Sequence, residues 1–358
     1  MISSANVALV MQNTFLENAL KNTSFSSDTI ALNLLILVLF GIAIFGILFL
    51  QIAKFKCQNL SKISRTISVY YLAFILLKYG FDKIFKSQFY LPEPNILYSQ
   101  FKDLSCDILY WSTIGTSRFY SISLGIIEVF TAVLLLINRT RIIGLLLSIG
   151  VFINIIIINF GFDISVKTFS ILLLSMTIYT LFPDLKLLYD FFIRRKQSQL
   201  NKSNYYFIKS TPIRFGIKTF VLGLFLIFIL LPYFESKNFN DDVASRPFLH
   251  GVYQVIDSNQ NSNVANITRF YIHRKNYLIF ENKNGKQTDY FFELNQSKKQ
   301  IKLIDYQLKA QVLEYEYSNK DSILKLIFPN FKIISKAENW RKSEVLKNDF
   351  HFTIDAVK

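Results

Sequence analysis

The side chain that most clearly invites chemistry is Glu128, which interrupts the apolar run of residues 119–138. A carboxylate at the middle of a bilayer costs about 2.5 to 3.5 kcal/mol or more, so such groups usually face a bundle interior and carry function. Ser121, Gly125 and Glu128 follow i, i+4, i+7 spacing on one helix face. The two small residues allow another helix to approach closely there. We therefore expect Glu128 to point into a helix bundle and not toward lipid.

Other polar groups fall where they could join the same site. Asn154 lies in the next apolar run, and a helical rise of ~1.5 Å per residue places it within about one turn of Glu128 in depth. The two side chains should meet if their helix faces match. Nearer the outer end of the helices, a second set of residues could line a pocket that opens there: Tyr79, Asp82, Lys83, Trp111, Gly115, Ser117, Asn159, Asp163 and Lys167.

These side chains permit three interpretations. In the first they only pack: Glu128 hydrogen-bonds to Asn154 or Ser121, and Asp163 with Lys167 fixes a loop. In the second they bind a quinone or another small ligand. The third is ion or proton conduction, which usually needs a relay of ionisable groups, whereas only Glu128 lies deep in the apolar run.

The cysteines and histidines argue against several redox chemistries. The chain has two cysteines, Cys57 and Cys106, which form no C-x-x-C motif and cannot hold an iron–sulfur cluster. All three histidines, His250, His273 and His351, follow the last apolar run, so no span offers a haem ligand. We expect neither a metal site nor an intrinsic cofactor, and a quinone is the one cofactor under consideration.

Six apolar runs indicate an α-helical integral membrane protein. Hydrophobic residues make up 51% of the chain, which contains 36 phenylalanines. Each run is close to the ~20 residues that a bilayer requires. The predicted spans are residues 29–52, 63–84, 119–138, 141–162, 165–183 and 213–234.

The net charge of +15 reflects topology and not nucleic-acid binding. The basic residues cluster in short segments between apolar runs, as the positive-inside rule requires. No basic helix, zinc-ligand set or stacking motif accompanies them. Three loops are basic: the one after the first span, the turn Arg139-Thr140-Arg141, and the stretch before the last span. With the N-terminus outside, all three fall on one side of the membrane. We therefore expect a bacterial inner (plasma) membrane protein, with segment 1–28 and the C-terminal domain extracytoplasmic and Cys57 and Cys106 on opposite sides.

The C-terminal segment, residues 235–358, changes to short alternating strands spaced by turn residues. Asn284-Gly285 between two of them is a strong hairpin signal. The pattern predicts an all-β antiparallel meander, with closure into a small lipocalin-like barrel as one form of it. Two interpretations stay open: an open cavity that holds a lipid or small molecule, or a filled core that docks on a partner. The expected transmembrane domain is 29–234.

Several stretches of the chain carry a family resemblance: Tyr70–Ala73, Tyr79–Phe81, Trp111 with Gly115, Gly125 with Glu128, Asn159 with Asp163 and Lys167, and Pro183–Leu185. Through them, residues 62–192 resemble the DoxX-like family of bacterial membrane proteins, in particular its Bacteroidetes-type branch with a C-terminal soluble domain. The resemblance implies a four-helix core. It also implies an association with quinone-linked sulfur oxidation or with membrane redox complexes, although the chain carries no thiol motif.

Together these features favour an inner-membrane subunit or accessory of a redox or envelope-maintenance complex that contacts a quinone. Without a metal or haem, it would need a partner protein or a diffusing quinone for electron transfer. The alternative is a non-catalytic membrane scaffold whose β domain binds a partner or lipid. A small transporter is a third option, weakened because the sequence shows no internal repeat.

Overall fold

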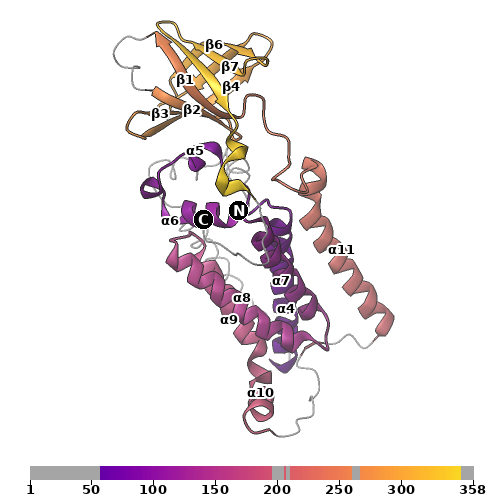
Figure 1. Ribbon diagram of the computed structural model, residues 1–358. Coiled ribbons are helices and arrows are strands. Elements are labelled where there is room, and N and C mark those ends of the chain that lie inside the picture. Colours follow the sequence, from indigo (N-terminus) through magenta and orange to yellow (C-terminus); the bar gives the residue numbers. More distant parts are fainter. Residues whose placement is uncertain (1–56, 196–204, 207–209, 260–266, 348–358) are drawn as a thin grey trace. The chain divides into compact units, whose positions relative to one another are not determined.

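A computed structural model describes residues 57–195, 205–206, 210–259 and 267–347. These residues form two compact units (Figure 1). The helix unit contains the described residues up to Gln88 together with 122–239, and the barrel unit contains 89–121 with the described residues from 240 on. The predicted segment 1–28 and the predicted span at 29–52 lie outside the described residues.

Five helical stretches of the described chain are long and apolar enough to cross a membrane. They are Leu60–Ile84, Arg118–Leu136, Arg141–Gly161, Lys167–Phe192 and Thr211–Ser236. Helices are therefore found at all five predicted spans from residue 63 onward. Their elements are α4 (Cys57–Ile84), α7 (Arg118–Leu136), α8 (Arg141–Gly161), α9 (Lys167–Leu181), α10 (Leu185–Phe192) and α11 (Thr211–Ser236).

The helix unit has an apolar core and an apolar surface. Its core includes Leu72 and Leu76 of α4, Leu135 of α7, Phe152 of α8 and Leu173 of α9. Large apolar side chains also remain exposed along α7, α8 and α11. Exposed apolar side chains along helices of this length are typical of segments that face hydrocarbon.

Two glycines set the closest helix approach in this unit. A Cβ atom added at Gly125 of α7 would lie 2.6 Å from the backbone oxygen of Gly80 in α4, and one at Gly80 would lie 2.9 Å from the Gly125 oxygen. Real Cβ atoms do not come so near to backbone, so both positions require glycine. This crossing brings the end of α4 against the middle of α7.

The crossing yields a matched test. Gly125→Ala should lower the thermal stability of the detergent-purified chain, because the new methyl group meets backbone and the helices must separate. Gly150→Ala in α8 is the control, since nothing lies within 4 Å of its added Cβ, and alanine favours the helix. Equal melting temperatures for the two variants would contradict the close crossing.

The barrel unit is built on eight strands in sequence order, each antiparallel to the next, and β8 pairs with β1 to close the barrel (Figure 1). The strands are β1 (Gly251–Asn259), β2 (Ile267–His273), β3 (Tyr277–Asn282), β4 (Gln287–Asn295), β5 (Gln300–Ile304), β6 (Ala310–Ser318), β7 (Ile323–Ile327) and β8 (Lys332–Glu338). The predicted antiparallel meander is confirmed, and of the forms that the sequence left open, a closed or a half-open barrel, the structure has the closed one. A further strand predicted near residue 350 lies outside the described residues.

The inside of the barrel is packed with side chains. Alternate residues of the strands point inward and form one apolar cluster that includes Phe270, Phe292, Leu313, Leu326 and Ile333. An eight-stranded barrel is just wide enough for such side chains to fill it. Of the two interpretations left open by the sequence, this arrangement supports the filled core.

The segment 89–121 groups with the barrel and not with the helices. It contains α5 (Pro94–Leu97), a 3-10 turn at Phe101–Asp103 and α6 (Cys106–Thr116). The sequence had placed this stretch inside the domain 29–234, because its short helices carry no pattern that links them to strands far along the chain. Gln287 of β4 supplies one such link, since its Nε2 donates to the Asn95 carbonyl at 3.0 Å.

Candidate functional site

Glu128 forms a buried ion pair in the helix unit. Lys83 Nζ of α4 lies 2.9 Å from Glu128 Oε2 of α7, and the two side chains are only 8% and 6% exposed. The ammonium group also lies 5.6 Å from the centre of the Tyr79 ring. The prediction that Glu128 faces the bundle is confirmed. Its partner is Lys83, one helical turn beyond the glycine crossing.

The expected contact between Glu128 and Asn154 is wrong. Asn154 is exposed on α8, whereas Glu128 is turned toward α4. The two residues were expected at similar depth along their helices, but their side chains point in different directions. Depth follows from residue counting, while the rotation of each helix depends on packing that counting does not include.

A second buried carboxylate, Asp82, ties α11 to α4. It accepts hydrogen bonds from Lys78 one turn earlier in α4 and from the hydroxyl of Tyr233 in α11. The Tyr233 oxygen also lies 3.1 Å from Ser87 Oγ. Sequence reasoning missed Tyr233. The available signal was a tyrosine near the end of the last apolar run, where a hydroxyl must find a polar partner.

The remaining predicted site residues have local roles. Asn159 is buried, and its amide donates to Ser170 Oγ at 3.2 Å, which joins α8 to α9. Asp163 and Lys167 form an ion pair, but Asp163 is 88% exposed, and the pair pins the loop between those helices. The lysine lowers the pKa of Asp163. These residues make separate local contacts, and the pocket that they were expected to line stays a prediction.

Trp111 belongs to the barrel unit. It lies on α6 with its ring 5.0 Å from that of Phe89. The helix of Trp111 packs against the preceding chain, since a Cβ on neighbouring Gly115 would meet the Tyr90 carbonyl oxygen at 2.2 Å. In this unit Trp111 is part of an aromatic packing cluster.

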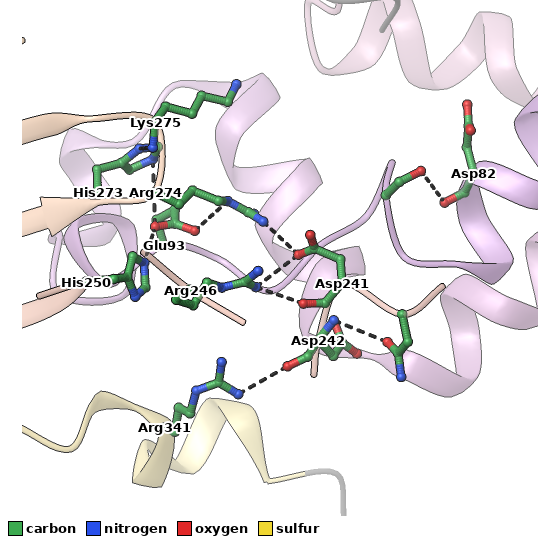
Figure 2. A network of polar contacts seen from close by, with 12 residues as sticks. Asp82, Glu93, Asp241, Asp242, Arg246, His250, His273, Arg274, Lys275 and Arg341 are labelled. Carbon is green, nitrogen blue, oxygen red and sulfur yellow. Dashed lines mark hydrogen bonds and ion pairs between the residues drawn. The ribbon is translucent and has the colours of Figure 1, made fainter. Parts of the chain in front are cut away.

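The barrel unit contains a buried polar network that the sequence did not reveal (Figure 2). Its centre is Glu93, which precedes α5. One carboxylate oxygen lies 2.8 Å from His250 Nε2, and the other lies 2.7 Å from Arg274 Nε. His273 Nε2 lies 3.9 Å from the Glu93 oxygen that contacts His250. A glutamate far from the strands in sequence is thus held by residues at the start of β1 and around the end of β2.

Arg274 extends the network to a second carboxylate, Asp241. Its Nη1 lies 2.7 Å from Asp241 Oδ2, and Arg246 Nη2 lies 3.0 Å from the same oxygen. The Arg274 guanidinium also stacks over Tyr90, 3.9 Å from the ring centre. Two arginines and two carboxylates therefore balance each other in a largely buried place.

These contacts fix the protonation states of the network. Burial alone would raise the pKa of Glu93, but the His250 hydrogen bond and the Arg274 charge outweigh it and lower the pKa. Burial lowers the pKa of His273 to about 4. The Lys275 backbone N–H donates to His273 Nδ1 at 3.1 Å, which requires that nitrogen to be unprotonated. His273 is therefore neutral at pH 7.

The buried polar contacts of both units join elements that are distant in the sequence. The described residues contain no group of three or more histidine, cysteine, aspartate or glutamate side chains placed to hold a metal ion. The buried carboxylates Glu93, Asp241 and Glu128 are each paired with a cationic side chain. A groove of about 440 Å³ opens beside β1 and β8, and its lining includes Phe248, Tyr317, Trp340 and Arg341. Its aromatic lining is typical of protein contact surfaces.

Comparison with known proteins shows one relationship. No model of a known protein family matches the chain, and no solved structure matches it. The chain is 34% identical over 114 residues to the uncharacterized protein YwoB from Bacillus subtilis (strain 168), a match that covers 32% of this chain and 72% of that protein. The chain therefore belongs to the same family as YwoB.

The buried pair predicts large effects on stability. Glu128→Leu should destabilise the helix unit by about 3 to 5 kcal/mol, because Lys83 would be left buried without its carboxylate. Asn154→Leu is the control, since this exposed side chain should tolerate the change within about 0.5 kcal/mol. Denaturation of the full chain in detergent measures both. A Glu128→Leu chain as stable as the Asn154→Leu chain would show that the pair does not hold the helices.

The network predicts acid sensitivity of the barrel unit. His273 has a folded pKa of about 4, below its ordinary 6.5, so the unfolded chain binds a proton first as the pH falls. Stability should decline between pH 6.5 and 4, by at most about 3 kcal/mol from this group. Glu93, whose pKa is also lowered, adds to the decline at lower pH.

His273→Asn should flatten this dependence, because asparagine does not titrate and its oxygen can still accept the Lys275 hydrogen bond. The measurement is the melting temperature of the barrel transition from pH 7 to 4, compared with wild type. An identical slope in both proteins would rule out His273 as the titrating group.

Proposed function

We propose that this member of the YwoB family is a membrane-anchored, non-catalytic scaffold subunit of a bacterial envelope complex. The observation that carries the proposal is the filled barrel interior, which leaves its outer surface for binding. The Glu93 network stiffens the barrel, and the helix unit supplies an anchor in which Glu128 is paired with Lys83. Such a chain is anchored in the membrane, presents a rigid surface to a partner and needs no cofactor of its own.

The groove beside β1 and β8 is the surface we assign to the partner. Phe248 is 43% exposed at its edge, beside the buried Trp340. Exposed aromatic residues in a concave surface are the usual anchors of protein interfaces. The partner is therefore a protein segment with an apolar side chain that fits between these rings.

The partner surface can be tested on the full chain in native membranes. Tagged wild type, purified in mild detergent, should retain a protein partner at constant stoichiometry, and Phe248→Ser should lose most of it. Val312→Ser on β6 is the control, because Val312 is 49% exposed and apolar but outside the groove. Equal retention by both variants, or a stoichiometric lipid in place of a protein, would contradict the assignment.

A redox accessory that contacts a quinone is the second candidate, and the Lys83–Glu128 pair beside Tyr79 is the observation in its favour. A quinone carbonyl could accept from Lys83 while Glu128 exchanges a proton. Mass spectrometry of lipids bound to the purified chain separates the two candidates. Stoichiometric quinone that disappears in Glu128→Gln supports the redox role, and its absence from wild type supports the scaffold.

The proposed topology places the barrel unit outside the inner membrane, in the manner of the DoxX-like branch that residues 62–192 resemble. Cys106 is exposed at the start of α6 and offers a direct probe. A membrane-impermeant maleimide should label it in intact spheroplasts of a Cys57→Ser strain. Labelling that requires lysis would invert the topology and place the barrel in the cytoplasm.

A further inference from the structure

One end of the helix unit gathers cations around the last turn of α7. Three consecutive backbone carbonyls there accept side-chain hydrogen bonds: Leu134 from Thr140 Oγ1 at 2.9 Å, Leu135 from Arg141 Nε at 3.0 Å, and Leu136 from Lys218 Nζ at 2.8 Å. The carbonyls at a helix C-terminus lack partners within the helix and attract positive charge. They draw a cation from α8 and another from α11 to the same turn.

Arg141 is buried beside the last turn of α7. Its Nη2 donates to Asn138 Oδ1 at 2.6 Å, and its guanidinium lies 4.3 Å from the centre of the Tyr205 ring. The partners of Arg141 and Lys218 in the structure are carbonyls, an amide and a ring, which neutralise no charge. Within the described part of the chain, no ion pair with a carboxylate is formed by either residue.

Arg65 of α4 adds a third cation with an unmet donor. Its guanidinium lies 5.8 Å from the centre of the Tyr179 ring, and its Nε is buried with no hydrogen-bond partner among the described residues. Buried polar atoms in proteins nearly always have a partner, so such a donor points to an acceptor from outside these residues.

Tyr205 places Arg65 and Arg141 in one neighbourhood. Burial raises the pKa of Tyr205 to about 12, Asp184 adds to the rise, and the charges of Arg141 and Arg65 oppose it. Among the described residues, Asp184 is the carboxylate whose charge acts on Tyr205, against the three cations Arg65, Arg141 and Lys218. The cluster keeps an excess of positive charge.

A short amphipathic helix sits at the same end of the unit. α10 continues from α9, exposes Tyr189, Phe191 and Phe192, and is followed by Arg194 and Arg195. Apolar and basic side chains in this order are typical of helices that lie at the level of lipid headgroups. The cation cluster is therefore at the depth where a phospholipid phosphate would be found.

We propose that the cluster of Arg65, Arg141 and Lys218 binds the phosphate group of an anionic phospholipid. The phosphate oxygens accept from Arg65 Nε and neutralise the excess charge, while the acyl chains lie along the exposed apolar faces of the helices. Guanidinium groups suit phosphate because their donors match its oxygens in pairs. This site rests on the membrane placement of the helix unit and not on the barrel's partner.

Native mass spectrometry of the full chain, released from detergent with added phosphatidylglycerol or phosphatidylcholine, tests the site. Wild type should retain phosphatidylglycerol in preference to phosphatidylcholine. Arg65→Gln should reduce its retention about fivefold, as expected for loss of one cation near the membrane surface. Arg194→Gln is the control, because Arg194 is an exposed cation at the same end that already pairs with Asp190.

The proposal is overturned by equal retention of the two lipids in wild type. It is also overturned if Arg194→Gln lowers retention as much as Arg65→Gln, which would mean diffuse surface charge. A rise in melting temperature with inorganic phosphate equal to that with phosphatidylglycerol would indicate a free-anion site and contradict a lipid site. A missing protein partner in the pull-down would leave these results unchanged, so failure of the two proposals can be distinguished.

Discussion

A lysine and a glutamate buried among apolar helices stay there only as a pair, since either charge alone is strongly unfavourable away from water. Lys83 and Glu128 meet because Gly80 and Gly125 let α4 and α7 approach until backbone nearly touches backbone. The crossing fixes the distance between the helices, and the ion pair fixes their rotation and register. Asp82, the neighbour of Lys83, accepts a hydrogen bond from the Tyr233 hydroxyl and thereby joins the same end of α4 to α11.

The barrel unit solves a similar problem with arginines. Arg274 reaches two carboxylates at once, because a planar guanidinium carries donors on more than one edge. Its partner Glu93 comes from the segment 89–121, and the network thereby joins that segment to the strands. In contrast to the helix unit, this network includes a neutral histidine, which makes its stability depend on pH.

Much of the architecture could be predicted from the sequence because it follows from hydrophobic periodicity. Five runs of ~20 apolar residues predicted the helices, and the alternation of apolar and polar residues predicted the strands. Asn284-Gly285 lies in the turn between β3 and β4, where Gly285 has a positive φ of 77°. The inward direction of Glu128 followed from its small neighbours on the same helix face.

The partners of the polar residues could not be predicted in the same way. Glu128 was expected to meet Asn154 because sequence spacing gives depth, but the rotation of α8 depends on packing across the whole bundle. The Glu93 network joins residues more than a hundred positions apart, and no local pattern marks such a contact. Arg141 illustrates the same limit: its basic turn predicted topology, whereas its burial against Tyr205 depends on the fold.

The charges inside the helix unit hold helices together. A double-mutant cycle with Lys83→Met and Glu128→Leu, followed by denaturation of the full chain in detergent, tests this most directly. We expect each single change to be strongly destabilising and the double change to recover most of the loss, with a coupling free energy of at least about 2 kcal/mol. Additive effects, with coupling within about 0.5 kcal/mol, would contradict it.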